Sequence, residues 1–308
     1  MPTMPERTPL HAVARCAFCD AMSATGMPDR RAFLRLAGAG AALAAWPAWA
    51  REGVEVGAPS ALSQLVPAEQ IERAATGQYA SMLTQAAQQR AVGPADHPQV
   101  RRLRYISDRI IPFTYEWNPR ARGWRWEVNL IGSKQINAFC MPGGKIAFYY
   151  GILDRLKLSD DEVAMVMGHE MTHALREHAR EQMGKTMATR GAIEIGAAIF
   201  GLGNGGRLLA DMGGQLLTLK FGRADETEAD LVGLELAARS GYDPRAGTTL
   251  WEKMAAASKN APVELLSTHP SGPTRIGDIR ANLPKVEGLY ARAPKPAERF
   301  GPPAPRGG

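Results

Sequence analysis

Cysteine is scarce in this 308-residue chain, and two of its three cysteines, Cys16 and Cys19, lie near the N-terminus. Beyond these two, the sequence contains only Cys140. A mature chain that begins after Cys19 can therefore form no internal disulfide and cannot bind a metal ion through several thiolates. A dense stripe of Lys and Arg with interleaved aromatic residues is also lacking, and residues 51–308 carry 32 Lys or Arg against 28 Asp or Glu. This near balance of charge argues against nucleic acid as a partner.

Long apolar runs are missing too. The run Leu36–Trp46 follows the pair Arg30 and Arg31, ends in Ala48-Trp49-Ala50, and is shorter than the roughly 20 residues that span a bilayer. This pattern is typical of a twin-arginine signal peptide. We therefore predict that residues 1–50 direct export and are cleaved after Ala50, which leaves the mature chain in the periplasm, free to associate with the membrane. An uncleaved anchor and a later start at Met22 or Met27 remain alternatives.

The local pattern divides the mature chain into three parts. Residues 67–92 are rich in Ala and Gln at helical spacing, which predicts an N-terminal helical extension over 51–97. Alternation from Trp124 to Leu130 and a turn at 142–144 predict short strands and a hairpin. Helical patterns follow to about Leu283, so we expect a mostly helical α+β domain over 98–284. A flexible tail rich in Pro and Gly is expected over 285–308.

The segment that begins at Ser159 carries the chemistry. Ser159 and Glu162 form the pattern of a capping box, so a helix begins here and carries His169, Glu170 and His173. Residues four apart project from nearly the same face of a helix, so both imidazoles can reach one ion while Glu170 faces a bound water. This H-E-x-x-H spacing is typical of zinc peptidases. It predicts one Zn²⁺ held by His169 and His173, with Glu170 as the catalytic base.

A catalytic zinc usually takes three protein ligands and a water, so a third ligand must come from elsewhere. The candidates are Glu194 and Glu226. We favour Glu226 because Asp230, one helical turn later, could accept the free ring N–H of a zinc-bound histidine. Glu228 points about 200° away from Glu226 on a helix and is expected to be solvated.

A second histidine follows the motif closely. His178 lies five residues past His173, about 140° round a continuous helix. It is therefore not expected to join the same ion, and a structural hydrogen bond is the expected role.

With His169-Glu170-x-x-His173 followed by Glu226-x-x-x-Asp230, the chain resembles the CAAX-prenyl-protease and HtpX-type gluzincin family, in its soluble periplasmic and mitochondrial quality-control branch. The likeness covers roughly 136–279. It includes Asn137-Ala138-Phe139, Pro142-Gly143-Gly144-Lys145-Ile146, Gly168, Gly241-Tyr242-Asp243-Pro244 and Ser267-Thr268-His269-Pro270-Ser271 with Arg275-Ile276.

The resemblance implies a zinc-dependent endopeptidase with a small antiparallel or mixed sheet beside a gluzincin-type active-site helix. Its substrates would be unfolded, misfolded or membrane-associated proteins, and partners could include the membrane surface or an outer-membrane assembly machine. Residues 137–140 would form an edge strand on which an extended peptide adds by backbone hydrogen bonds. The apolar segments 192–202 and 208–219 are expected to be core helices, with a mobile lid or a membrane contact as the second interpretation.

His269 has three open roles. It could act in catalysis by donating to the developing oxyanion, occupy the open zinc position as an inhibitory ligand, or serve as a structural turn residue. Arg275 is expected to pair with a core carboxylate. Two alternatives to a peptidase also remain. One is a periplasmic chaperone or assembly factor whose zinc site is latent or closed by His269, and the other is a structural zinc protein with four ligands.

Overall fold

The computed structural model describes residues 51–199, 216–259, 263–269 and 274–304, without the side chains of 190–199. The predicted signal peptide, residues 200–202 and residues 208–215 therefore lie outside the described residues, whereas the backbone of 192–199 forms the end of the helix His178–Ile199. Contacts divide the chain into two units, Met1–Arg51 and Glu52–Gly308, and only the second is described below.

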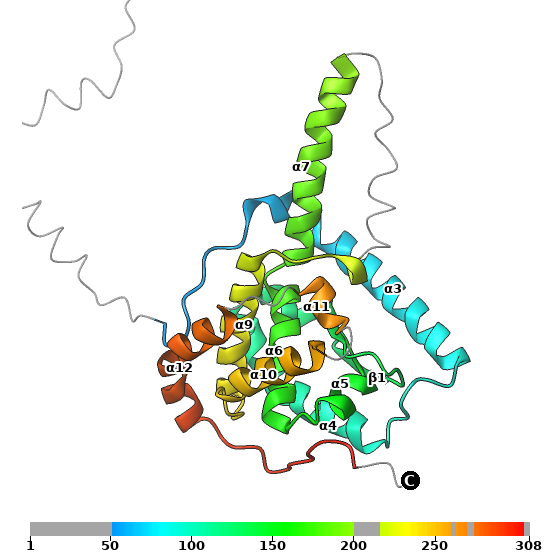
Figure 1. The fold of residues 1–308 in the computed structure, drawn as a ribbon. Helices are drawn as coiled ribbons and strands as arrows, with labels where there is room; N and C mark the ends of the chain where they lie inside the picture. The colour runs from blue at the N-terminus through cyan, green and yellow to red at the C-terminus, as the bar shows by residue number, and fades with distance from the viewer. Residues whose placement is uncertain (1–50, 200–215, 260–262, 270–273, 305–308) are drawn as a thin grey trace, which may run out of the picture. The chain divides into compact units, whose positions relative to one another are not determined.

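The fold is mostly helical with one small sheet, which confirms the predicted α+β class (Figure 1). In chain order the elements are η1 (Ala61–Leu65), α3 (Ala68–Gln88), α4 (Pro98–Ile110), η2 (Ile111–Glu116), η3 (Pro119–Gly123), β1 (Glu127–Ile131), β2 (Ala138–Met141), β3 (Lys145–Tyr149), α5 (Tyr150–Arg155), α6 (Asp160–Leu175), α7 (His178–Ile199), η4 (Leu216–Thr218), α9 (Arg223–Arg239), α10 (Ala246–Ser258), α11 (Leu265–Thr268) and α12 (Arg275–Arg292).

The sheet has the strand order β1-β3-β2 and is mixed. β1 runs parallel to β3, whereas β2 and β3 form an antiparallel hairpin around the turn at 142–144. One face of the sheet supplies Val128, Ile146 and Phe148 to the core around α6, and the other packs residues such as Ala147 against α3. β2 is therefore an edge strand, as predicted for residues 137–140.

The helix α3 is fastened to the sheet through a buried tyrosine. The hydroxyl of Tyr79 donates to the carbonyl oxygen of Ile146 at 2.5 Å and accepts from the side-chain amide of Asn129 at 3.0 Å. The N-terminal extension thus packs on the sheet, and the helix predicted by the spacing of 67–92 is confirmed.

The helix α6 lies among the other helices of this unit (Figure 1), with nearly all of its residues buried. Its N-terminus carries the predicted capping box: the Glu162 amide donates to the Ser159 hydroxyl and the Ser159 amide to the Glu162 carboxylate. A β-carbon on Gly168 would lie 2.9 Å from the carbonyl oxygen of Gly233, and one on Gly233 would lie 2.8 Å from the His169 amide nitrogen. These two glycines let α6 and α9 approach backbone to backbone.

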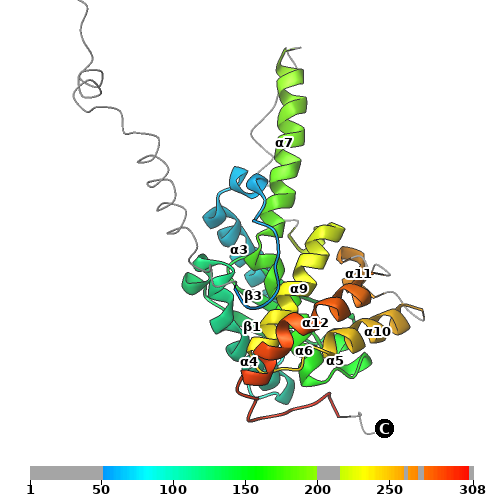
Figure 2. The same ribbon diagram turned by 90° about the vertical axis from the view of Figure 1, so that its left-hand side faces the viewer.

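α7 begins beside α6 and extends away from the other helices (Figures 1 and 2). The part that begins the helix packs against η1. No helix in the described parts of the chain combines the length and apolar composition needed to cross a bilayer.

The segment that precedes η1 is held against α9. Val54 is buried, and its amide donates to the carboxylate of Glu235 at 2.8 Å. Three residues on, the carbonyl oxygen of Gly57 accepts from the guanidinium of Arg176. The chain from Glu52 to Gly57 therefore forms part of the folded body.

The C-terminal segment differs from the prediction of a loose tail after Pro284. α12 continues through Pro284 to Arg292, and the segment beyond it is fastened to the start of α6. The amides of Phe300 and Gly301 donate to Asp160 at 2.7 and 3.1 Å, and Arg299 pairs with Asp161 at 2.9 Å. Proline stays in this helix because the ring costs one backbone hydrogen bond, which packing of the helix against its neighbours can offset.

Candidate metal centre

Two helices far apart in the sequence bring the predicted ligands together. α6 carries His169, Glu170 and His173, and α9 carries Glu226 and Asp230. All five residues are at most 5% exposed. Because residues four apart share a helix face, each helix turns its pair toward the contact between α6 and α9.

The distances between donor atoms fit one zinc ion. The Nε2 atoms of His169 and His173 lie 3.2 Å apart, and the Glu226 carboxylate oxygens lie 3.5 Å from the first and 3.6 Å from the second. Tetrahedral zinc with bonds of 2.0–2.1 Å places its ligand atoms about 3.3–3.4 Å apart. The side chain of Glu194, the other candidate for third ligand, lies outside the described residues.

His269, at the end of α11, joins the same cluster, because its donor atom lies within 4.8 Å of those of the other three. Its Nδ1 is 3.4 Å from His169 Nε2 and 2.9 Å from Glu226, and its Nε2 is 3.7 Å from Glu170. Burial alone would lower the pKa of His269, but the two carboxylates raise it above its usual range. The structure thus places His269 within ligand distance and beside the predicted base.

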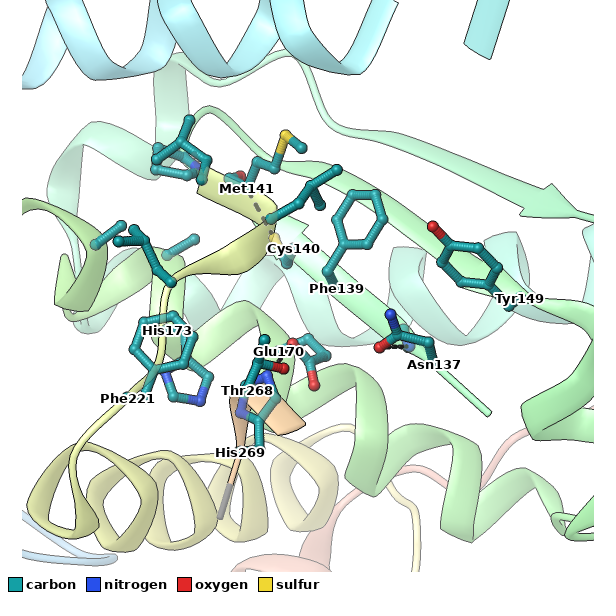
Figure 3. Close-up of a pocket in the computed structure, with 17 residues that line it drawn as sticks. Asn137, Phe139, Cys140, Met141, Tyr149, Glu170, His173, Phe221, Thr268 and His269 are labelled. Carbon is teal, nitrogen blue, oxygen red and sulfur yellow. Dashed lines mark hydrogen bonds and ion pairs between the residues drawn. The ribbon is translucent and has the colours of Figure 1, made fainter. Parts of the chain in front are cut away.

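Glu170 is fully buried beside the donor atoms, in contact with the pocket shown in Figure 3. Its Oε1 has no hydrogen-bond partner within the described part of the chain. Burial raises the pKa of the carboxyl, and the interactions with His269 and His169 offset this only in part. A raised pKa and an unpaired oxygen are what a general base that takes a proton from water requires.

Asp230 and Arg275 orient His169. The Nδ1–H of His169 donates to Asp230 at 3.1 Å, so the lone pair of Nε2 is left for a metal. Arg275 donates twice to Asp230 and once to Glu226, each at 2.7 Å. Burial would raise the pKa of Asp230, but the bond from His169 and the guanidinium lower it. Arg275 therefore pairs with a core carboxylate, as expected, and with a second one.

His173 is supported on its other side. Its Nδ1 lies 2.9 Å from Nδ1 of His178, and Nε2 of His178 lies 3.2 Å from a carboxylate oxygen of Glu228. The expectation that Glu228 is merely solvated is wrong, since it also pairs with Arg176. Burial holds the pKa of His173 well below its usual range, and the neighbouring histidines and Arg275 lower it further. A neutral imidazole is the form that binds a metal.

A cavity of about 210 Å³ opens beside the cluster. In Figure 3, Glu170, His173 and His269 lie together at one end, whereas Asn137, Phe139 and Tyr149 line the other. The wall between them is β2, whose residues lie along the cavity.

In the described part of the chain, no strand pairs with the edge of β2 that faces away from β3. The Tyr149 amide donates to the Asn137 carbonyl, and in an antiparallel pair every second residue bonds to the neighbouring strand. Residue 139 therefore makes the next backbone bonds to β3. The backbone N–H and C=O groups of residues 138 and 140 point away from β3. The amide of Ala138 is taken by the side chain of Asn137. The amide of Cys140 and the carbonyls of Ala138 and Cys140 are therefore the groups that face outward.

Comparison with known proteins independently supports the interpretation of this cluster as a metal site. The mitochondrial metalloendopeptidase OMA1 of Arabidopsis thaliana is 40% identical over 153 residues, which are 50% of this chain and 30% of the relative. OMA1 of Schizosaccharomyces pombe is 34% identical over 63% of this chain and 56% of the relative. The metalloprotease LoiP of Escherichia coli is 28% identical over 62% and 73%.

The matched region thus spans about a third to three fifths of the OMA1 relatives. The similarity covers the part of the chain that forms the cluster, and the sequence profile of Peptidase family M48 matches residues 99–283. This range holds both histidines of the H-E-x-x-H motif, the glutamate and aspartate of α9, and His269. The chain belongs to peptidase family M48.

Proposed function

We propose that the chain is a zinc-dependent endopeptidase. The observation that carries this proposal is the meeting of two imidazole nitrogens and a carboxylate at tetrahedral spacing beside the unpaired oxygen of Glu170. His169, His173 and Glu226 would hold the ion. Zinc in such a site activates a water and polarises a carbonyl.

The residues of the chain divide the remaining chemistry. Glu170 takes the proton of the attacking water on its free oxygen and delivers it to the leaving amine nitrogen. His269, beside Glu170, is in position to donate to the oxygen of the scissile carbonyl as charge develops there. Arg275 holds Glu226 and Asp230 in place.

Substrate would bind as an added strand. An extended peptide can pair with the free edge of β2, so the scissile bond is presented to Glu170 by backbone hydrogen bonds alone. Because the recognition uses backbone groups, side-chain selectivity is loose, which suits unfolded or misfolded proteins as substrates.

The test is digestion of unfolded casein by the purified protein, compared with Glu170→Gln at equal zinc content. Loss of a general base lowers the rate by roughly 10²–10⁴-fold, so we expect the variant to be inactive while it keeps its zinc. Glu252→Gln, the same change on the exposed face of α10, is the matched control and is expected to cleave normally.

A second candidate function rests on His269. Because its Nδ1 lies 3.4 Å from His169 Nε2, it could complete a four-ligand site in a chaperone or assembly factor whose metal is latent. If the native protein binds zinc but does not cleave casein, His269→Ala separates the two functions. Cleavage by that variant means a peptidase held shut, and a lack of cleavage means that the endopeptidase proposal is wrong.

We propose that this activity belongs to protein quality control in the periplasm. Similarity to LoiP and to the β-barrel assembly-enhancing protease of Escherichia coli, 29% identical over 49% of this chain and 33% of that protein, supports the proposal. The name of the second relative assigns that protein to β-barrel assembly. Partners in outer-membrane assembly or at the membrane surface are proposed for this chain on the same ground.

A further inference from the structure

We propose that Glu228 and His178 form a hydrogen-bonded relay that holds His173 in the tautomer and orientation that bind the metal. Both are positioning residues, because they reach the ion only through His173. The inference rests on the metal site of the proposed function but not on peptide cleavage.

The relay depends on the interruption of the helical conformation between α6 and α7. α6 ends at Leu175, and Glu177 has a φ of 60°, a left-handed conformation that few residues other than glycine adopt. α7 then begins with His178 itself. In a continuous helix His178 would lie about 140° from His173, whereas the break turns its Nδ1 to 2.9 Å from that of His173.

The direction of each hydrogen bond follows from the groups at the end of the relay. A carboxylate only accepts, so the Nε2 of His178 that faces Glu228 at 3.2 Å carries the hydrogen. With the ring hydrogen on Nε2, the Nδ1 of His178 is an acceptor and takes the Nδ1–H of His173. The Nε2 of His173 is left as a bare lone pair, 3.2 Å from the equally bare Nε2 of His169.

Burial makes this assignment matter. His173 and His178 are 4% and 1% exposed, so water cannot replace either partner. If Nδ1 of His173 lost its acceptor, the hydrogen could move to Nε2 and block the metal. A fixed tautomer is worth roughly 10–100-fold in metal affinity in other sites with such partners.

The two histidine ligands are thus supported in parallel. His169 donates to Asp230, which Arg275 holds, and His173 donates through His178 to Glu228, which Arg176 holds. Arg176 also donates to Gly57. Glu226, Glu228 and Asp230 all lie on α9, with Glu228 on the side that faces α7 rather than the ion.

The test measures zinc affinity by competition with a fluorescent chelator, and the visible spectrum of the Co²⁺-substituted protein. His178→Phe keeps the ring and removes its acceptor, and we expect zinc to bind roughly 10–100-fold more weakly with an altered Co²⁺ spectrum. His178→Asn places an amide oxygen near the position of Nδ1 and is expected to restore affinity to within about threefold of the native protein. A merely structural role would not distinguish the two variants in this way.

Glu228→Ala provides a second route to the same answer, because its partly exposed side chain tolerates truncation. We expect it to weaken zinc binding, whereas Glu252→Ala on the surface does not. Combined with His178→Phe, it should add nothing, since both changes break one relay. Circular dichroism and thermal unfolding of the metal-free variants show that they fold.

Native zinc affinity in folded His178→Phe, or losses that multiply in the double variant, would overturn the relay. If His178→Phe does not fold, Glu228→Ala alone decides by the same criterion. Failure of the native protein to cleave casein would count against the endopeptidase and leave these zinc affinities, and the relay, unaffected.

Discussion

Burial shifts the pKa of several side chains around the site, and Cys140 is the clearest case. It lies on β2 and lines the cavity beside Glu170. Burial raises the pKa of its thiol well above the usual range, and the negative charge of Glu170 adds to the effect. The thiol therefore stays protonated at neutral pH although it lies near the site of chemistry.

We expect Cys140 to react slowly with thiol reagents. Only the thiolate is a nucleophile, and a raised pKa means that its fraction increases only at alkaline pH. At pH 8 the native protein, without residues 1–50, should react with iodoacetamide at least about tenfold more slowly than the same chain in denaturant. Reaction rates that are equal in the two states would show that the thiol is accessible and ionised.

At the scale of single residues, the sequence predicts which side chains share a helix face, but it does not predict which hydrogen-bond partners they have. The spacing of His169 and His173 is enough to predict a shared helix face. The pairing of His178 with His173 was not predictable, because it depends on the left-handed conformation of Glu177. Nothing in the local pattern indicates that the helix breaks there.

At the scale of the elements, the site depends on how closely α6 and α9 pack. The two helices touch where Gly168 and Gly233 face each other, and a β-carbon at either position would lie under 3.0 Å from backbone atoms of the partner helix. The helices cannot separate at this point without moving Glu226 away from the histidines.

Gly233→Ala should therefore lower both stability and zinc affinity. We expect a loss of roughly 1–3 kcal/mol in the free energy of unfolding, as for other overpacked cores, and weaker binding of zinc. Thermal unfolding of the metal-free protein and chelator competition measure the two effects.

The matched control is Gly277→Ala in α12, where a β-carbon would meet nothing within 4 Å. At this position alanine should leave the free energy of unfolding unchanged or raise it by up to about 1 kcal/mol, because alanine has a higher helix propensity than glycine. If Gly233→Ala behaves like this control, the close contact between α6 and α9 is not what sets the ligand geometry.

Elements with strong local signals were predicted correctly, and those decided by distant contacts were not. The capping box at Ser159 located the start of α6, and alternation located the strands. The sequence predicts that the last helix ends near Leu283, whereas α12 continues through Pro284 to Arg292, because the neighbours that hold the helix leave no local signal. Likewise, the bonds from Phe300 and Gly301 to Asp160 join segments 140 and 141 residues apart, which no local pattern reveals.

For the whole molecule, the sequence predicts export by a twin-arginine signal. Substitution of Arg30 and Arg31 by lysines should retain the protein in the cytoplasm, since the pathway recognises the arginine pair. Fractionation followed by N-terminal sequencing is the measurement, and the periplasmic form should begin at Arg51. A periplasmic protein that still contains residues 1–50 would contradict cleavage after Ala50.

The position of Val54 has a practical consequence for anyone who produces this protein. Val54 is buried four residues after the proposed cleavage site, and Gly57, three residues further, receives the Arg176 guanidinium that also holds Glu228. A purification tag fused directly before Arg51 would place its last residues next to these contacts. A tag after Gly308, or a removable one that leaves Arg51 as the first residue, is the safer choice for preparations in which zinc content is to be compared.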